Sequence, residues 1–303
     1  MKIFDCFTFF NELELLELRL EALYDFVDCF VIVESNKTHR NENKDYNFEL
    51  HKDKYARFHD KIKYIKLDEY MPYKGEDDWS LENHQRNYIM TGLIDALPSD
   101  LIMISDIDEI PNPRIVKRLK ENEDLYVKYT GHKKFLSRHF KKVKLKLMAK
   151  RFLANPYAFY MRKLTDLLKT GPVVLEQELF YYYMNCRSKG KWYGTEMVLY
   201  KNLKEPQKVR NVRDYLPRVE DGGWHFSYMG GVERIIKKMH STVEPDEKMA
   251  KKEWLEKCMD EGVDLYGRSG ADEFEYEFLN IEDVGCPKIV DFCKKYPQFI
   301  KEI

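Results

Sequence analysis

The chain has 303 residues, of which 44% are hydrophobic, and its 51 basic and 52 acidic side chains leave a net charge of -1. This length and composition allow one large α/β domain with a sizeable core, and the near-zero net charge gives no electrostatic reason to expect nucleic acid as a partner. The six cysteines form no C-x-x-C pair and no apolar run reaches the roughly 18 residues of a membrane-spanning helix, so the sequence predicts no disulfide framework, zinc finger or transmembrane segment.

The N-terminal segment has the pattern of a strand, a helix and a second strand. Residues 2–10 are apolar and β-prone, and Asn11 can cap a helix that continues to about Tyr24. Residues 29–35 are another short apolar run that ends in polar residues. Buried strands joined by a helix are typical of a βαβ unit, so we expect a parallel sheet.

Four further elements follow before the pattern becomes less regular. Residues 62–67 are predicted to form a third strand, residues 81–97 a helix that ends at a proline, and residues 101–105 a fully apolar strand. Pro111 and Pro113 then open another helix.

The second half of the chain has weaker signals. Residues 172–184 are interpreted as a strand pair, and the pattern becomes helical near 231–241 and again near 246–260. The predicted fold class is therefore α/β, with a mostly parallel central sheet flanked by helices.

An Asp-x-Asp motif, Asp106-Ile107-Asp108, directly follows the apolar strand 101–105. In open parallel sheets, ligands bind beyond the carboxyl ends of the strands, where this motif lies. Along an extended backbone the two carboxylates point to the same side and repel each other. A hard cation such as Mn²⁺ or Mg²⁺ relieves that repulsion and keeps coordination sites for diphosphate oxygens. The alternative is a solvated strand end or a helix cap before Pro111, with no metal.

Two classes of enzyme place Asp-x-Asp after an apolar strand. In haloacid-dehalogenase-like phosphatases the first Asp is a nucleophile, and a Thr or Val stands two positions beyond the second Asp. Here that position is Ile110, and a long segment precedes the motif. Metal-dependent glycosyltransferases of the GT-A type carry a βαβ nucleotide-binding half before the motif, so the order of elements favours this second class.

Six blocks of sequence make the comparison more specific. They fall in order along the chain at residues 9–20, 30–36, 82–86, 104–111, 192–195 and 222–231. Together they resemble glycosyltransferase family 17. The resemblance implies a GT-A-like fold, a UDP-sugar donor (UDP-N-acetylglucosamine in the animal members), a divalent metal and inversion at the anomeric carbon.

The candidate donor contacts lie near the ends of the first two strands, on the helix before the motif, in the motif itself and in the last block. They are Glu12, Glu34, Ser35, Asn36, Gln85, Arg86, Asp106 and His225. Arg86 suits a diphosphate because its planar fork donates two parallel hydrogen bonds, but it could equally form a solvated i,i+4 pair with Glu82. Glu12 also has an ordinary alternative, as an acidic residue in the first turn of a helix.

His225 lies between Trp224 and Phe226, after two glycines that permit close approach of the backbone. The resemblance makes it a candidate metal ligand together with Asp106 and Asp108. An isolated histidine between aromatic residues is, however, more often a hydrogen-bonded core residue.

An inverting transfer also needs a carboxylate that takes the proton of the attacking hydroxyl group. Glu109, beside the motif, and Asp221, before the Gly-Gly-Trp block, are the two candidate bases. Trp192 and Tyr193 could stack on an acceptor sugar or serve as ordinary core aromatics.

We therefore expect one catalytic domain over residues 1–303, with a nucleotide-sugar-binding half at 1–120 and an acceptor-side half with C-terminal helices at 121–303. The predicted activity is metal-dependent, inverting transfer of a sugar, N-acetylglucosamine by resemblance, from a UDP-sugar to a glycan acceptor. The alternatives are a haloacid-dehalogenase-like phosphatase and a non-catalytic, metal-dependent glycan-binding module.

The expected location is the cytoplasm, because the sequence starts directly at the predicted catalytic domain and lacks the membrane anchor of the animal members. The basic stretch 133–151 is either a solvated face or a contact for an anionic acceptor or a membrane surface. Peripheral contact with a membrane is therefore included among the predicted partners.

Overall fold

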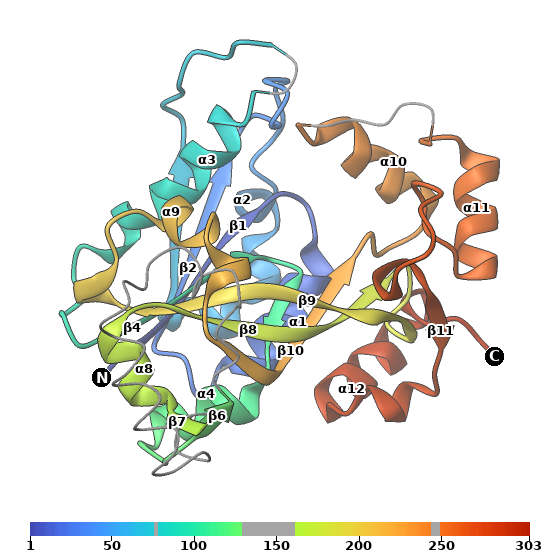
Figure 1. Cartoon of the computed structure of the whole chain (residues 1–303). Helices are drawn as coiled ribbons and strands as arrows, with labels where there is room; N and C mark the ends of the chain where they lie inside the picture. Colours follow the sequence, from blue (N-terminus) through green and yellow to red (C-terminus); the bar gives the residue numbers. More distant parts are fainter. Residues whose placement is uncertain (76–77, 129–160, 244–248) are drawn as a thin grey trace, which may run out of the picture.

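The computed structural model describes residues 1–75, 78–128, 161–243 and 249–303. In this part of the chain a curled sheet runs through the middle of the molecule, with helices packed around it (Figure 1). The order of its strands is β3-β2-β1-β4-β9-β8-β10-β5, and β11 pairs with β9. A separate two-stranded sheet joins β6 to β7. The predicted α/β class is confirmed.

The first part of the large sheet is parallel. β1 (Ile3–Phe9) lies between β2 (Cys29–Ser35) and β4 (Leu101–Asp106), and β3 (Ile62–Leu67) extends the sheet beyond β2. α1 (Leu13–Leu23) makes the connection from β1 to β2. β1, β2 and β4 are buried almost throughout, because helices cover both of their faces. The predicted βαβ unit and the strands at 62–67 and 101–105 are confirmed.

The second part of the sheet is mixed. β9 (Cys186–Leu199) is antiparallel both to β4 and to β8 (Val173–Tyr181). β10 (Arg218–Ser227) lies parallel to β8, and β5 (Glu109–Pro111) is antiparallel to β10. The expectation of a mostly parallel sheet is therefore wrong for this part. The short connection between β8 and β9 forces an antiparallel pairing, because a parallel one needs a long crossover.

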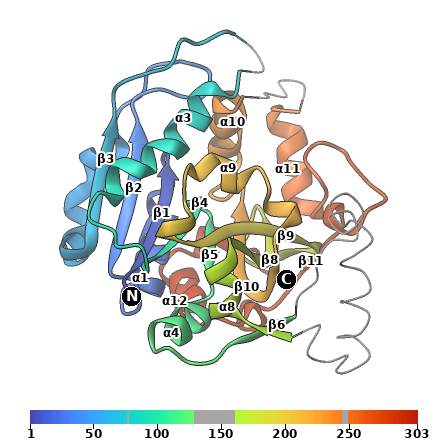
Figure 2. The same ribbon diagram turned by 60° about the vertical axis from the view of Figure 1, so that its left-hand side comes forward.

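Two apolar clusters cover the opposite faces of the parallel strands, and β1 contributes to both because its side chains alternate. Phe7 enters the cluster shared with α1 and α4 (Pro113–Lys120). Cys6 enters the cluster shared with α9 (Pro206–Arg210) and with the 3-10 helix η2 (Tyr88–Leu93), which directly follows α3 (Ser80–Asn87). Figure 2 shows α3 and α9 close together on the same side of the sheet. This arrangement brings two helices far apart in sequence to one end of β4.

α1 is buried on more than one side. Leu16 and Leu20 pack into the sheet cluster, and Leu15 and Leu18 pack with α12 (Pro287–Lys295). The predicted cap is wrong by one position, since the N-cap residue is Glu12 and not Asn11. The Glu12 carboxylate instead accepts a hydrogen bond from the backbone N–H of Asn11 at 3.0 Å, which leaves this carboxylate at the edge of the helix.

Two of the other predicted elements differ from the structure. The helix expected at 81–97 is α3 followed by the 3-10 helix η2 (Tyr88–Leu93), where Gly92 packs so tightly on Val31 that an added Cβ would lie 2.4 Å from its Cγ1. The strand pair expected at 172–184 is the single strand β8, whose partners are β9 and β10. The helices expected after residue 230 are confirmed as α10 (Val232–Ser241) and α11 (Lys252–Glu261).

The remaining elements of the described chain are short. They are α2 (Asn47–His51), η1 (Lys52–Lys61), β6 (Tyr126–Lys128), β7 (Met161–Lys163), α8 (Leu164–Thr170), η3 (Tyr200–Asn202), η4 (Arg213–Tyr215), η5 (Asp272–Phe274), β11 (Tyr276–Phe278), η6 (Ile281–Val284) and η7 (Pro297–Phe299). Within the described ranges, none of the helices combines the length and the apolarity that crossing a bilayer requires.

Candidate active site

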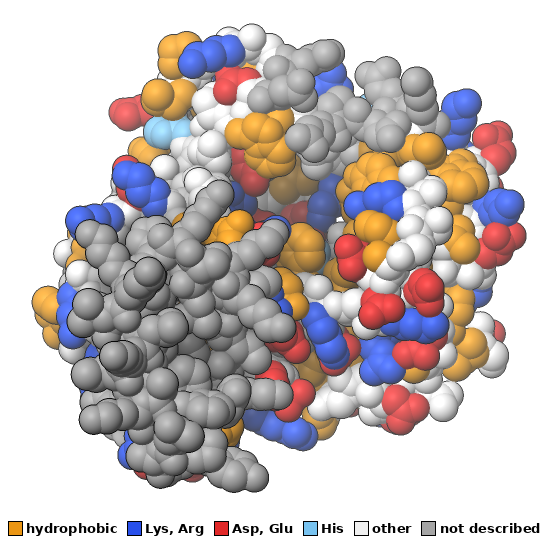
Figure 3. Space-filling view, in the orientation of Figure 1, with side chains coloured by type: hydrophobic (Ala, Val, Ile, Leu, Met, Phe, Trp, Pro, Cys, Tyr) orange, Lys and Arg blue, Asp and Glu red, His pale blue; other side chains and the backbone are white. Residues whose placement is uncertain are grey.

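A cleft of about 360 Å³ opens at the carboxyl ends of β1 and β4, between α3 and α10. Figure 3 shows the hollow near the middle of this face, with acidic and basic side chains on its walls. This volume lies within the roughly 300–1,000 Å³ that is typical of small-molecule sites. Its charged and imidazole side chains are Glu12, Lys37, His39, Lys44, Glu82, Arg86, Asp106, Asp108, His225 and Lys238.

Arg19 of α1 holds the turn that carries the Asp-x-Asp motif. Its Nη1 donates to the carbonyl oxygens of Asp106, Ile107 and Glu109 at 3.0, 3.2 and 2.9 Å. Its Nε and Nη2 donate to the two carboxylate oxygens of Asp5, and both side chains are fully buried. Because a guanidinium group buried without partners would be strongly unfavourable, the packing of α1 on the sheet fixes the shape of this turn.

Asp106 is bound by two arginines. Arg86 Nη2 donates to its Oδ1 at 2.9 Å, and Arg210 Nη2 donates to its Oδ2 at 2.8 Å. Thr8 Oγ1 also donates to Oδ1, at 3.2 Å. Burial alone would raise the pKa of Asp106, but the charges of Arg86 and Arg210 hold it well below its usual range. Asp106 is therefore an ionised carboxylate whose two oxygens both accept hydrogen bonds from the protein.

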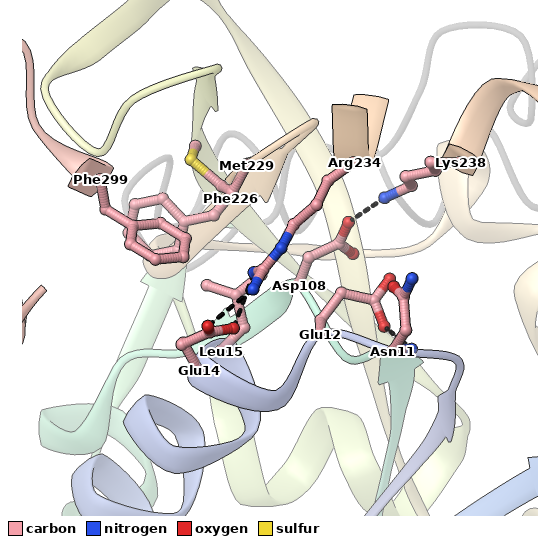
Figure 4. Close-up of a pocket in the computed structure, with 10 residues that line it drawn as sticks. All are labelled: Asn11, Glu12, Glu14, Leu15, Asp108, Phe226, Met229, Arg234, Lys238 and Phe299. Atoms are coloured by element: carbon pink, nitrogen blue, oxygen red, sulfur yellow. Dashed lines mark hydrogen bonds and ion pairs between the residues drawn. The ribbon is translucent and has the colours of Figure 1, made fainter. Parts of the chain in front are cut away.

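Asp108 meets a different set of partners. Lys238 Nζ of α10 donates to its Oδ2 at 2.8 Å, and His225 Nε2 lies 3.6 Å from its Oδ1. Figure 4 shows Lys238 reaching across from α10 to this carboxylate, with Glu12 beside it. Burial would raise the pKa of Asp108, but the charge of Lys238, with His225, lowers it well below its usual value. The motif thus directs its two carboxylates toward separate cations.

His225 lies in β10 directly opposite Glu109 of β5. Its ring packs against Trp192, with the ring centroids 4.5 Å apart. Its Nδ1 is buried and has no hydrogen-bond partner within the described residues. The glycines before it do allow close approach, because an added Cβ on Gly223 would lie 2.1 Å from the carbonyl oxygen of Ile110. The structure therefore brings His225 to Asp108, as the metal prediction requires, and leaves one ring nitrogen unsatisfied.

The two candidate bases lie in different environments. Glu109 is fully buried; it accepts hydrogen bonds from Arg210 at 2.9 and 2.5 Å and from Trp192 Nε1 at 2.6 Å. Burial would raise the pKa of Glu109, but Arg210 keeps it below its usual value. Asp221 is exposed, has a φ of 53°, and does not contribute to the lining of the cleft. The structure therefore places Glu109 beneath the motif and Asp221 outside the cleft.

Gln85 and Arg86 are both brought to the cleft from α3. Gln85 Nε2 donates to the carbonyl oxygen of Val33 at 3.0 Å, and its Oε1 lies 3.1 Å from Nε2 of His39. Arg86 forms the predicted i,i+4 pair with Glu82 at 3.0 Å, but its side chain is only 3% exposed and also reaches Asp106. The solvated alternative for Arg86 is thus wrong.

The lining of the cleft does not include the three polar residues at the end of β2, which are Glu34, Ser35 and Asn36. Glu34 is fully buried and accepts from Lys44 Nζ at 3.0 Å and from the N–H of Phe48 in the first turn of α2 at 2.9 Å. Ser35 Oγ accepts from the N–H of Lys37 at 2.9 Å, and Asn36 binds Tyr70. These bonds fix the loop after β2, which carries lining residues that the sequence did not single out.

The charged residues that line the cleft and that the sequence analysis missed are lysines. Lys37 and Lys44 follow β2, and Lys238 lies on α10. Arg210 on α9, which was also missed, does not line the cleft but contacts Asp106 of the motif. Their partners are distant in sequence, so no local spacing marks them. A weak signal was available for Lys238 alone, because it lies on the helix that follows the Gly-Gly-Trp-His block.

The predicted aromatic acceptor contacts are already stacked on protein groups. The Trp192 ring has the Arg213 guanidinium 4.5 Å from its centroid, in addition to His225. The Tyr193 ring has the Arg218 guanidinium 3.6 Å from its centroid. Of the two, Trp192 lines the cleft. The basic stretch 133–151 lies outside the described residues.

The fit of a divalent cation can be judged from these donors. Within the described ranges, no three His, Cys, Asp or Glu side chains are grouped to hold a metal. Mg²⁺ is, however, commonly bound by one or two protein carboxylates, with substrate phosphates and water completing its shell. Asp108 and His225 suit such a shared site, because Asp108 Oδ1 and His225 Nε2 lie 3.6 Å apart. The two carboxylate oxygens of Asp106 already accept hydrogen bonds from Arg86 and Arg210.

Comparison with known proteins shows a family resemblance in the first part of the chain. Residues 1–136 match the sequence profile described as Glycosyltransferase family 17. The beta-1,4-mannosyl-glycoprotein 4-beta-N-acetylglucosaminyltransferases of Homo sapiens and Rattus norvegicus are each 32% identical to this chain over 107 residues, and that of Mus musculus is 31% identical over 107 residues. The aligned segment is 33% of this chain and only 20% of each relative, so the match spans about a fifth of the length of these proteins. The resemblance found in the sequence is confirmed for residues 1–136, which match the profile of glycosyltransferase family 17.

Proposed function

We propose that the protein is an inverting glycosyltransferase that transfers N-acetylglucosamine from a UDP-sugar bound in the cleft to a glycan acceptor. The observation that carries the proposal is the convergence of Gln85, Arg86, Asp106 and Asp108, all within the family-17 segment, on one cleft at the carboxyl ends of β1 and β4. The names of the human and rat relatives support N-acetylglucosamine as the sugar. A GT-A-like arrangement is part of this proposal, supported by the parallel β3-β2-β1-β4 half of the sheet.

The charges of the cleft support a diphosphate ligand. Lys37, Lys44, Arg86 and Lys238 contribute cationic groups to its walls. Cations aimed at the leaving oxygens of a diphosphate stabilise the negative charge that develops when the bond to the sugar breaks. A neutral ligand would gain nothing from this arrangement, whereas a UDP-sugar would.

A divalent cation, Mn²⁺ or Mg²⁺, is also part of the proposal. Asp108 and His225 would hold it, and when bound it would neutralise charge on the diphosphate. Arg86 and Arg210 keep Asp106 ionised and fixed, so that this carboxylate orients the arginine forks at the edge of the cleft. The proposed metal therefore depends on two protein ligands and on donor oxygens.

In a direct displacement the acceptor hydroxyl oxygen bonds to the anomeric carbon while the bond from that carbon to the diphosphate breaks, and the hydroxyl proton passes to a carboxylate. Glu109 and Asp221 remain the proposed bases. Glu109 could act only after Arg210 withdraws from its two oxygens, and Asp221 only after moving toward the cleft. Substituting each by the matching amide distinguishes them, because only the true base would lose turnover while keeping affinity for UDP.

Calorimetric titration with UDP, with and without Mn²⁺, tests the proposal directly. The wild type should bind UDP in a metal-dependent manner, and Asp108→Asn should lose the metal dependence. Asp166→Asn is the matched control, because this exposed aspartate on α8 pairs only with Lys169 among its ion-pair partners in the described structure. Absence of UDP binding by the wild type under every condition would contradict the proposed donor.

The same preparation separates the alternatives. A phosphatase would release phosphate from a simple phosphoester without any sugar acceptor. A glycan-binding module would bind oligosaccharide without ever consuming UDP-N-acetylglucosamine. The proposed enzyme would release UDP from UDP-N-acetylglucosamine in the presence of an acceptor glycan.

A further inference from the structure

Lys238 differs from the other cations that contact the motif. Arg86 and Arg210 are 3% and 8% exposed, and each guanidinium binds more than one carboxylate. The Lys238 side chain is 30% exposed on the cleft wall, and the one carboxylate within ion-pair distance of its ammonium group in the described structure is Asp108. An ammonium group on a flexible stem can change partners, whereas two buried guanidinium forks cannot do so without leaving carboxylates unpaired.

The position of Lys238 places it between two spaces. Asp108, Lys238 and Glu12 line the main cleft and also a small adjoining cavity of about 20 Å³ that Figure 4 draws. At the wall of the main cleft, the negative charge of Asp108 is thus paired with the ammonium group of Lys238. An anion that enters the cleft would meet this ammonium group.

The attachment of α10 keeps Lys238 within reach of the cleft. Arg234, one turn earlier on the same helix, donates to both carboxylate oxygens of Glu14 at 2.7 Å. The link between β10 and α10 has positive φ values at Tyr228 (56°), Gly230 (92°) and Gly231 (90°). A positive φ at a bulky tyrosine is rare and needs surrounding contacts to maintain it. Here the Tyr228 hydroxyl lies 2.6 Å from that of Tyr266, and this contact holds the backbone segment that leads into α10.

We propose that Lys238 is a ligand of the donor diphosphate, and that its ammonium group exchanges Asp108 for phosphate oxygens when a nucleoside diphosphate enters the cleft. The inference rests on the proposed function and deepens it. Release of Asp108 Oδ2 leaves that oxygen free for the divalent cation. Lys238 is therefore an internal cation that holds Asp108 until the donor and the metal arrive together.

If Lys238 exchanges Asp108 for phosphate, Lys238→Met should change the affinities for UDP and for Mn²⁺ in opposite directions. Affinity for UDP at saturating Mn²⁺ should fall about 10- to 100-fold, which is the range expected for a lost hydrogen bond to a charged group. Affinity for Mn²⁺ alone should rise, because a competing positive charge is removed from Asp108. Lys238→Arg keeps the charge and should bind UDP within about tenfold of the wild type.

The experiment is calorimetric titration of wild type, Lys238→Met and Lys238→Arg with UDP at saturating Mn²⁺, with uridine, and with Mn²⁺ alone. Lys257→Met is the matched control, since this lysine lies on α11, is 56% exposed, and pairs only loosely with Glu261 at 4.0 Å. The control should match the wild type in all titrations. Thermal melting confirms that each variant is folded.

The outcomes separate this inference from the proposed function. If the wild type binds no UDP, the proposed donor fails and the role of Lys238 fails with it. If the wild type binds UDP and Lys238→Met binds it equally well, only the role of Lys238 is overturned. Equal losses for uridine and UDP would show a packing effect and would also overturn it. Unchanged affinity for Mn²⁺ alone would overturn the exchange at Asp108.

Discussion

Arg210 donates a hydrogen bond to Asp106 at 2.8 Å, although the two residues lie 104 positions apart in the chain. The same guanidinium group contacts Glu109 and Glu196, both fully buried. A short helix from the second half of the chain thus fixes the first carboxylate of the motif. Asp106 has a structural role that its position in an Asp-x-Asp motif does not reveal.

The first prediction separates the two motif carboxylates by stability. Asp106→Ala removes a partner from two nearly buried arginines and should lower the free energy of unfolding by on the order of 3 kcal/mol. Asp108→Ala should cost less, about 1 kcal/mol, because Lys238 is exposed enough to be hydrated. Urea unfolding monitored by circular dichroism measures both. Equal losses in the two variants would contradict the distinction.

The second prediction concerns Arg19, which holds the motif turn. Arg19→Met leaves the buried carboxylate of Asp5 unpaired and three turn carbonyls without a donor, so we expect a loss of about 3–5 kcal/mol. The double variant Arg19→Met/Asp5→Leu should recover part of this loss, because no unpaired charge remains buried. If the double variant is less stable than the single one, the loss comes from packing and the predicted cause is wrong.

The third prediction concerns Gly194 of β9, which packs against the buried Glu109. A Cβ on Gly194 would lie 2.6 Å from Glu109 Cδ, and the carboxylate cannot move away without breaking its bonds to Arg210. Gly194→Ala should therefore lower the melting temperature. It should also weaken binding in the cleft, because the added methyl group would displace the carboxylate that binds Trp192, a lining residue. Gly171→Ala is the control, since its Cβ would meet nothing within 4 Å. Identical melting temperatures for the two variants would contradict the clash.

The fourth prediction is a loss of stability in acid. The pKa values of Asp106, Asp108 and Glu109 are all lowered in the fold by neighbouring cations, against the opposing effect of burial. The unfolded chain therefore binds more protons, and the stability these groups supply is complete above their unfolded pKa values of about 4. It is lost progressively as the pH falls below about 4 toward the folded values. Glu196, whose pKa burial raises, acts in the opposite direction.

Urea unfolding at about pH 7, 5, 4 and 3 measures this dependence. The free energy of unfolding should change little between about pH 7 and 5 and then fall steeply. Asp108→Asn should show a shallower fall, since one of the groups no longer titrates. A wild-type stability that rises as the pH falls from about 7 to 4 would show that the raised pKa of Glu196 dominates.

Much of the fold could be predicted from local patterns. The apolar runs of β1, β2 and β4 are long enough to be strands and apolar enough to be buried on both faces, which requires helices on both sides and favours parallel pairing. α10 and α11 were also found from their helical patterns. The antiparallel β9 was missed, because its half-polar sequence carries no clear period and its pairing with β4 depends on residues about a hundred positions away.

The candidate site, like the fold, was predictable from the sequence only in part. The position of Asp106 and Asp108 at the end of a buried strand follows from the sequence, because the strand is an apolar run and ligands bind at that end of a parallel sheet. The proximity of His225 to Asp108 was anticipated only through the family resemblance. The burial of Glu109 and the outward position of Asp221 were not foreseeable.

By itself the sequence determined the βαβ half, the place of the motif and the resemblance of residues 1–136 to glycosyltransferase family 17, because each depends on neighbours along the chain. The tertiary structure alone decided which cations face which carboxylates. Arg86 comes from α3, Arg210 from α9 and Lys238 from α10, and their distances to the motif depend on how these helices pack on the sheet. Charge partnerships of this kind arise from packing, and no spacing in the sequence encodes them.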